Sequence, residues 1–207
     1  GRDPRQTPPF SIVLFPLHRA VLFCGIGGIL AVKSGPKPAD LDAGANLASC
    51  FADLRQAPLS RVIAGRVEPE GYLSGTGPLA EMERDLALLR QEPHFQSLFF
   101  NPGKAGSLKS LVPEMAAFLA GEEALLEAEA GRFATAEMEI ITGRLILLKD
   151  VLWGLEKDIL ANIGKILHLA AASDPRELSP ESFTQYVRVN FLLNCIDRLE
   201  VRGRDSA

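Results

Sequence analysis

The sequence contains few of the residues on which several common kinds of site depend. Its 207 residues include three cysteines, three histidines and one tryptophan. The cysteines, Cys24, Cys50 and Cys195, stand too far apart in the sequence to suggest the dense disulfide framework of a small secreted domain. So low a cysteine content is typical of a reducing compartment, and we expect a cytoplasmic protein.

Positive charge is also scarce. The 22 Lys and Arg residues are outnumbered by 26 Asp and Glu residues, and the formal net charge is -4. The basic residues are scattered along the chain, whereas a protein that neutralises a phosphate backbone gathers them into a patch. We therefore expect no nucleic-acid partner.

The sequence also lacks an unbroken apolar run of the length that a transmembrane helix needs, which is about 20 residues. Residues 10–32 are apolar except for His18 and Arg19, and the glycines in the second half of this run weaken a helix. No clear small-residue cleavage site of a signal peptide follows it. We expect a leader or propeptide over residues 1–23, a buried strand over residues 24–33 and no membrane partner. Export or a membrane tether is the alternative.

Patterns typical of metal and nucleotide sites are missing as well. Glutamates gather between residues 122 and 139, but the Glu-x-x-His pairs of di-iron bundles are absent. The glycines between residues 25 and 28 lack the third glycine and the following helix of a dinucleotide fingerprint. We therefore expect no metal site and no cofactor, and we interpret the acidic residues as a solvated face.

Helical periodicity, by contrast, is present throughout residues 34–179. Apolar residues recur at steps of three and four around residues 40–55, 79–91 and 104–131. A short helix is expected over residues 94–100, and Pro113 should start a new helix or kink the one in which it lies. The fold is therefore expected to be mainly α, and the core of the chain to be a helical bundle.

The strongest periodic segment runs from Met138 to Ile159, where the apolar residues form a heptad-like seam. The helix that carries this seam should continue to about residue 171, with glycines that permit close approach of a neighbouring helix. Trp153 lies one position off the seam and is expected to pack against a neighbouring helix. Gly131 ends the preceding helix, so the two helices should form a long antiparallel hairpin.

A further pattern joins the two ends of the sequence. Cys24 opens the stretch Cys-Gly-Ile-Gly-Gly, and Leu199 opens the stretch Leu-Glu-Val-Arg-Gly-Arg-Asp-Ser-Ala. The second stretch follows a helix that should begin at Pro180 and pass through Gly203 into a charged turn. In this order the two stretches resemble the opening of the class II glutamine amidotransferases, whose nucleophile is an N-terminal cysteine. The glucosamine-6-phosphate synthase-like branch is the most similar.

The resemblance implies how the chain is divided. Residues 24–33 and 180–207 would be the two ends of a partial α+β glutamine amidotransferase domain of the N-terminal-nucleophile class. Residues 34–179 would be an all-helical insertion between them. The sequence departs from the family here, because in the family a single helix connects the two stretches.

The resemblance also implies the chemistry. Cys24 would attack the side-chain amide of glutamine, with its own α-amine as the general base, once residues 1–23 have been removed. Gly25 would let the backbone approach the substrate. Arg202, Gly203 and Asp205 would shape a turn beside the thiol. Glutamine is then the expected substrate, and a sugar phosphate is the possible ammonia acceptor in a domain beyond this sequence.

Two other interpretations remain open. If the resemblance does not hold, Cys24 is a small hydrophobic residue in a buried strand, and Arg202 is an ordinary cation near a helix C-terminus. The chain would then be a non-catalytic helical module. In that case the seam from Met138 to Ile159 would mediate docking or homo-oligomerisation.

Overall fold

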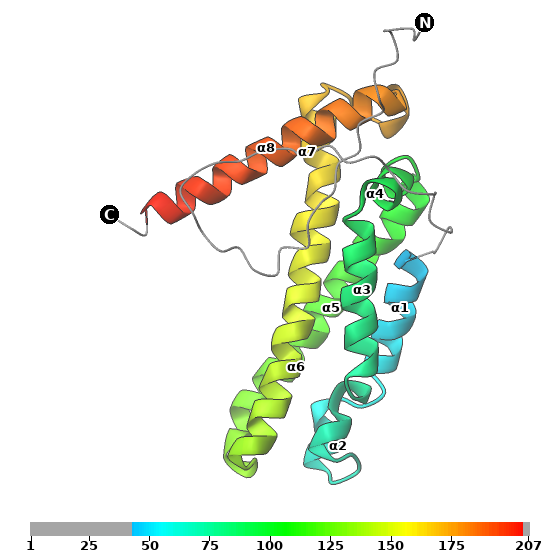
Figure 1. Cartoon of the computed structure of the whole chain (residues 1–207). Coiled ribbons are helices and arrows are strands. Elements are labelled where there is room, and N and C mark those ends of the chain that lie inside the picture. The colour runs from blue at the N-terminus through cyan, green and yellow to red at the C-terminus, as the bar shows by residue number, and fades with distance from the viewer. Residues whose placement is uncertain (1–42, 205–207) are drawn as a thin grey trace, which may run out of the picture.

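The computed structural model describes residues 43–204, with side chains as far as residue 197, and every regular element in that range is helical (Figure 1). The prediction of a mainly α fold is therefore confirmed, whereas the strand expected over residues 24–33 lies outside the described residues. The α-helices are α1 (Ala43–Leu54), α2 (Leu59–Ile63), α3 (Gly77–Leu89), α4 (Glu92–Phe99), α5 (Pro102–Glu129), α6 (Thr135–Trp153), α7 (Ala161–Leu169) and α8 (Pro180–Arg204). Shorter 3-10 segments are η1 (Pro69–Ser74), η2 (Ala130–Arg132) and η4 (Pro175–Glu177), and η3 (Gly154–Leu160) is a π-helix.

The first helices pack as their periodicity predicts. Leu47, Phe51 and Leu54 share one face of α1 and are almost completely buried. This face lies against α3, with which α1 makes its most extensive contact. Burying a leucine or phenylalanine side chain stabilises the fold by about 1.5–3 kcal/mol, so this pair of helices forms one wall of the bundle.

The expected antiparallel hairpin is present. Helices α5 and α6 are joined by the single turn η2, and Lys149 Nζ of α6 lies 2.9 Å from Glu123 Oε1 of α5. Pro113 does not start a new helix, because α5 continues through it from Pro102 to Glu129. Proline removes one backbone hydrogen bond, and the burial of Leu111 and Met115 on either side outweighs that loss.

Beyond α6 the helix continues without interruption through the π-helix η3 into α7, close to the predicted end. Gly154 stands at the start of η3. A Cβ atom added there would lie 2.5 Å from Leu86 Cδ2 and 2.7 Å from Arg90 Nη2 of the α3 region. The glycine therefore permits the close approach of α3, as expected, whereas Gly143 and Gly164 have open space around them.

The seam of α6 is part of the chain's own core. Ile141, Leu148, Leu155 and Ile159 have no measurable exposure in the bundle. These four residues are therefore not available to a second copy, whereas Met138 and Leu152 of the same seam are partly exposed. Homo-oligomerisation through the helical region stays a prediction.

A buried arginine fixes the irregular connection between α2 and α3. Arg144 of α6 donates hydrogen bonds to the backbone carbonyls of Glu70 (2.6 Å), Pro69 (3.4 Å) and Tyr72. This connection contains two non-glycine residues with positive φ, Leu73 at 51° and Ser74 at 58°. Such backbone angles are uncommon, and the guanidinium holds the segment that contains them against α6.

Helix α8 lies across the end of α7 and extends beyond the bundle (Figure 1). It begins at Pro180 as predicted and passes through Gly203 to Arg204, and the charged turn expected after it lies outside the described residues. A glycine inside a helix costs only about 1 kcal/mol relative to alanine, which is too little to end a helix by itself. None of the described helices meets the length and apolarity that a membrane span requires.

Candidate functional site

The structure locates only part of the predicted catalytic site. Cys24, Gly25 and Asp205 lie outside the described residues. Arg202 and Gly203 form the last turn of α8, of which the backbone alone is described. The neighbourhood of the thiol therefore stays a prediction. The described residues show how α8, which leads to Arg202 and Gly203, is held against the bundle.

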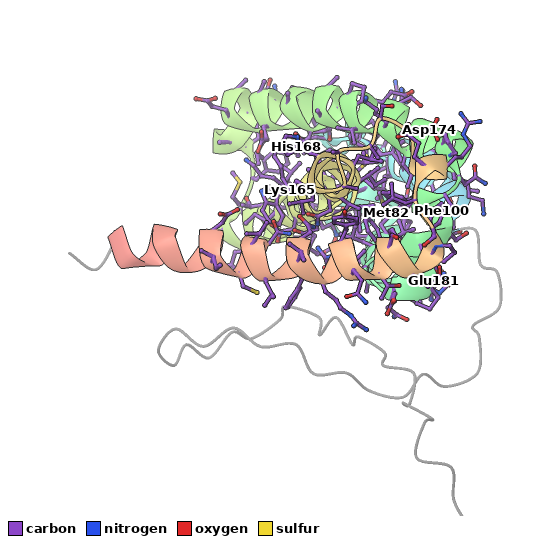
Figure 2. All side chains as sticks on the ribbon, turned by 90° about the horizontal axis from the view of Figure 1, so that it is seen from above. Met82, Phe100, Lys165, His168, Asp174 and Glu181 are labelled. Atoms are coloured by element: carbon purple, nitrogen blue, oxygen red, sulfur yellow. The ribbon has the colours of Figure 1, made fainter. Side chains whose placement is uncertain are left out.

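An aromatic cluster anchors the start of α8. The ring of Phe183 is fully buried, and its centroid lies 4.7 Å from that of Phe99 and 5.4 Å from that of Phe100. Phe95 completes the cluster at 6.0 Å. Close aromatic pairs of this kind add about 0.5–1.5 kcal/mol each to the effect of burial. Figure 2 shows Phe100 beside this first part of α8.

Amide side chains then fix how α8 is rotated against α7. The Oδ1 atom of Asn162 in α7 accepts hydrogen bonds from the Nδ2 atoms of Asn190 (2.9 Å) and Asn194 (3.0 Å) in α8. Lys165 Nζ donates to Asn194 Oδ1 at 2.6 Å. Asn190 is buried, and a buried amide without partners costs about 1–3 kcal/mol. Rotation of α8 about its axis would break this network.

The opposite side of α8 carries an uncovered apolar face. Val189, Leu192, Leu193 and Ile196 are 44%, 38%, 42% and 58% exposed. Their spacing of three, one and three residues places them on one side of the helix. We call these four residues the α8 apolar face. This face was not predicted, although the spacing of the four residues is visible in the sequence.

Glu122, the buried carboxylate of α5, has a structural role. Its Oε2 atom accepts a hydrogen bond of 2.8 Å from the backbone N–H of Leu59, the first residue of α2. A carboxylate is favoured at a helix N-terminus, where it satisfies an unpaired N–H group. Burial raises the pKa of Glu122 above its usual range, and burial together with Glu122 raises the pKa of Tyr72.

The surroundings of Cys50 disfavour its thiolate form. Cys50 is 5% exposed on the α1–α3 contact, and its Sγ atom lies 3.8 Å from Glu81 Oε2. Burial raises the pKa of the thiol, and the charges of Glu81 and Asp85 raise it further. The thiolate is the reactive form, so this arrangement keeps Cys50 in its unreactive thiol state.

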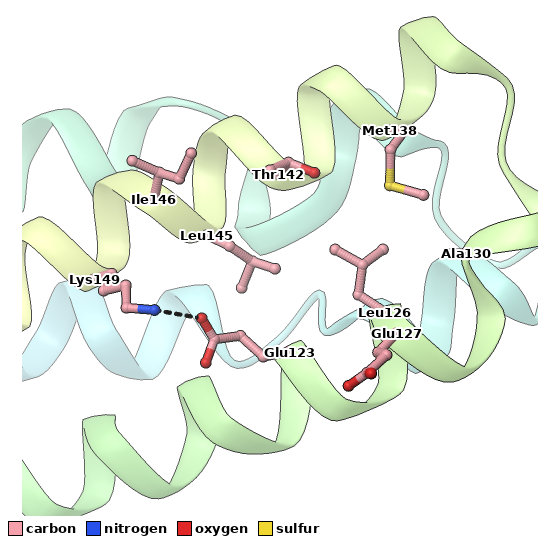
Figure 3. A pocket seen from close by; sticks show the side chains of 9 residues that line it. All are labelled: Glu123, Leu126, Glu127, Ala130, Met138, Thr142, Leu145, Ile146 and Lys149. Carbon is pink, nitrogen blue, oxygen red and sulfur yellow. Dashed lines mark hydrogen bonds and ion pairs between the residues drawn. The ribbon is translucent and has the colours of Figure 1, made fainter.

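A hollow beside the hairpin turn has apolar walls (Figure 3). It encloses about 310 Å³ between α5 and α6, and its lining includes Leu126, Leu145 and Ile146. The charged residues at its edge are Glu127 and the ion pair between Glu123 and Lys149. Thr142 is the remaining polar residue of its lining.

Residues 43–204 contain no group of three His, Cys, Asp or Glu side chains that could hold a metal ion. Comparison of the chain with protein-family models, with curated proteins and with solved structures finds no match. The features on which a function can be argued are therefore those of this chain itself. They are the α8 apolar face and the sequence pattern that follows it.

Proposed function

We propose that the chain is the N-terminal part of a glutamine amidotransferase, resembling the glucosamine-6-phosphate synthase-like branch, into which the helical bundle is inserted. The observation that carries the proposal is the α8 apolar face. It lies on the helix that leads directly into the stretch from Leu199 to Ala207, and the bundle leaves it uncovered. A helix of the partial α+β domain is expected to keep such a face for the rest of that domain, including the strand of Cys24.

The positions of the two bundle ends support an insertion. Asn46, in the first turn of α1, is hydrogen-bonded to Asp85 near the end of α3. Thr184, in the first turns of α8, is 3.4 Å from Glu92 at the start of α4, which follows α3 directly. The bundle therefore begins and ends on the same side, where a host domain can accept both connections (Figure 1).

The connecting segment is long enough for this arrangement. Residues 34–42 link the predicted strand to α1, and nine residues span at most about 32 Å when fully extended. The helical rise places Ile196 about 24 Å from Pro180 along α8. We therefore expect the connection to leave the strand of Cys24 free to pack against the α8 apolar face.

The proposed chemistry needs few side chains. The α-amine of Cys24 takes the thiol proton, and Sγ attacks the carboxamide carbon of glutamine. Ammonia departs with a proton returned by the amine, and a thioester remains. Water then adds to the thioester, which releases glutamate and regenerates the thiol. The amine is available as a base only after residues 1–23 have been removed.

The test is to treat the purified full-length protein with a diazoketone analogue of glutamine and to locate the label by mass spectrometry. We expect a mature N-terminus at Cys24, one label on Cys24 and none on Cys50, which serves as the internal control. Cys24→Ser should abolish both labelling and glutamine hydrolysis. A protein that keeps residues 1–23 and takes no label would contradict the proposal.

A non-catalytic docking module is the second candidate, and the same apolar face favours it. The two functions can be separated with Leu193→Asp. If the face receives the catalytic domain, this change should lower Cys24 labelling at least tenfold while the helical circular dichroism signal is unchanged. If the face only binds a partner protein, wild-type protein should show no labelling at all.

A further inference from the structure

A chain of polar contacts connects α3 to α8 through the long helix of the bundle. Arg90, which follows α3 directly, places Nη2 2.9 Å from Asp158 Oδ2 in η3. Asn162 in α7 donates a hydrogen bond of 2.6 Å from Nδ2 to the backbone carbonyl of Asp158. The Oδ1 atom of Asn162 accepts the hydrogen bonds of Asn190 and Asn194 described above. Asn162 therefore connects the helix that is tied to α3 with the helix that leads to the candidate site.

The orientation of the Asn162 amide follows from its partners. Its oxygen faces two donor groups on α8, and its nitrogen faces one carbonyl oxygen of its own helix. The reversed amide would place donors against donors and an acceptor against an acceptor. Asn190 and Asn194 stand four residues apart, so they lie one above the other on the same side of α8. A single side chain of α7 thus holds two successive turns of α8.

The π-helix η3 determines the direction in which Asn162 points. At its end the backbone N–H of Ala161 bonds to the carbonyl of Glu156, which is five residues earlier instead of four. A turn with this spacing contains more residues than an α-helical turn, so the side chains after it are rotated relative to those of an uninterrupted α-helix. Gly154, at the start of η3, lets α3 approach so closely that Arg90 reaches this segment. Short π-helical segments inside α-helices frequently mark functional sites.

The second half of α8 has its main support at this contact. The aromatic cluster holds the helix at Phe183, and α7 is the element that α8 contacts most extensively. Beyond Asn194 the helix extends past the bundle to Arg204 (Figure 1). Arg202 lies eight residues after Asn194, or about 12 Å along the axis. The rotation of α8 that the amides hold is therefore also the rotation at which residue 202 leaves the helix axis.

Even a modest rotation of α8 is large compared with the precision that catalysis needs. The side chains of a helix reach about 5–6 Å from its axis, so a rotation of about 30° moves their ends by about 3 Å. A displacement of about 1 Å can lower the rate of an enzyme about a hundredfold. Hydrogen bonds weaken steeply when their angles fall below about 120°, so the amide network resists such a rotation.

We propose that Asn162 is a positioning residue of the candidate site, which holds α8 at the rotation that the turn of Arg202 and Gly203 requires. Lys165 (Figure 2) assists it, because its Nζ atom donates to Asn194 Oδ1 and leaves the Nδ2 atom of Asn194 for Asn162. The catalytic consequence rests on the proposed function, whereas the control of α8 by Asn162 does not. The inserted bundle then takes part in the geometry of catalysis instead of only separating the two ends of the catalytic domain.

The first test measures the rotation of α8 and needs no activity. Spin labels are attached to the full-length protein at Asp150→Cys on α6 and Asp197→Cys on α8, which are both exposed positions. Cys24 and Cys195 are replaced by serine in this protein. We expect double electron–electron resonance to give one narrow distance distribution, and Asn162→Ala to widen it at least twofold, because α8 is then free to rotate.

Two further variants make this measurement decisive. Asn46→Ala is the matched control, because it removes an amide that bonds Asp85 between α1 and α3, and it should leave the width unchanged. Lys165→Met changes an exposed residue and removes only the support of Asn194, so it should widen the distribution less than Asn162→Ala does. Circular dichroism verifies that each variant keeps its helices. A width that is unchanged in both Asn162→Ala and Lys165→Met, or increased equally by Asn46→Ala, would overturn the proposal.

The second test measures the catalytic consequence on protein with its native cysteines. The rate at which the saturating diazoketone labels Cys24 should fall at least tenfold in Asn162→Ala and stay within twofold of the wild type in Asn46→Ala. Equal rates in the two variants would overturn the catalytic role of Asn162. If the wild-type protein takes no label, the proposed function fails, and the distance measurement still decides whether Asn162 positions α8.

Discussion

Helices α6 and α8 contain the same kind of apolar spacing but meet different surroundings. On α6, Ile141 and Leu148 stand seven residues apart and are completely buried in the bundle. On α8, Val189 and Ile196 stand seven residues apart and are 44% and 58% exposed. Periodicity therefore predicts that a helix has an apolar face, but only the packing of the rest of the chain determines whether that face is covered.

The largest effect that separates the two regions should come from truncating one matched residue in each. We expect Leu148→Ala to lower the free energy of unfolding of the bundle by about 2–5 kcal/mol, because it opens a cavity that α1, α3 and α5 cannot fill. Ile196→Ala should change the same quantity by no more than about 0.5 kcal/mol. Urea denaturation followed by circular dichroism measures both. Equal costs would show that the α8 face is part of the bundle core.

Much of the bundle followed from local patterns. The buried face of α1, the α5–α6 hairpin and the start of α8 at Pro180 were all predicted, because spacing, turn residues and N-terminal proline act within a few residues. The role of Arg144 was not predicted, since its carbonyl partners lie more than seventy residues earlier in the chain. No pattern in a sequence shows which distant carbonyls a side chain will meet.

The candidate site was predicted less completely. The charged turn expected after Gly203 stays a prediction, because α8 is described only as far as Arg204. The exposure of Trp153 was missed, because a position beside a seam faces either a neighbour or solvent, depending on where the next helix lies. The interpretation of Cys24 stays a prediction, because it concerns residues outside the described part of the chain.

A smaller effect should separate the inward and outward glycines of the α6–η3 helix. Gly154→Ala places a methyl group against Leu86 and Arg90, so we expect a loss of about 1–3 kcal/mol, as for other overpacked sites. Gly143→Ala meets open space and removes a residue that is unfavourable in helices, so it should stabilise the protein by about 0.5–1 kcal/mol. Thermal unfolding of the two variants gives the signs. A stabilising Gly154→Ala would mean that α3 can shift away without cost.

The smallest expected effect concerns pH and compares a buried glutamate with its exposed neighbour in sequence. Burial raises the pKa of Glu122 in the folded state, so the folded protein binds the proton more tightly than the unfolded chain does. The stability that this difference provides is present below the unfolded pKa and is lost as the pH rises through the folded pKa. Glu122 thus favours the folded state less at pH 8 than at pH 4.

Glu122→Gln removes this titration while its amide oxygen can still accept the hydrogen bond from Leu59. We expect the variant to show a smaller loss of stability than the wild type between pH 4 and pH 8, measured by urea denaturation at each pH. Glu123→Gln is the control, because Glu123 is exposed and its ion pair with Lys149 contributes at most about 1 kcal/mol. If the two variants show the same pH dependence, the carboxylate of Glu122 is solvated in the folded protein. The cap of α2 would then be an ordinary surface contact rather than part of the buried core.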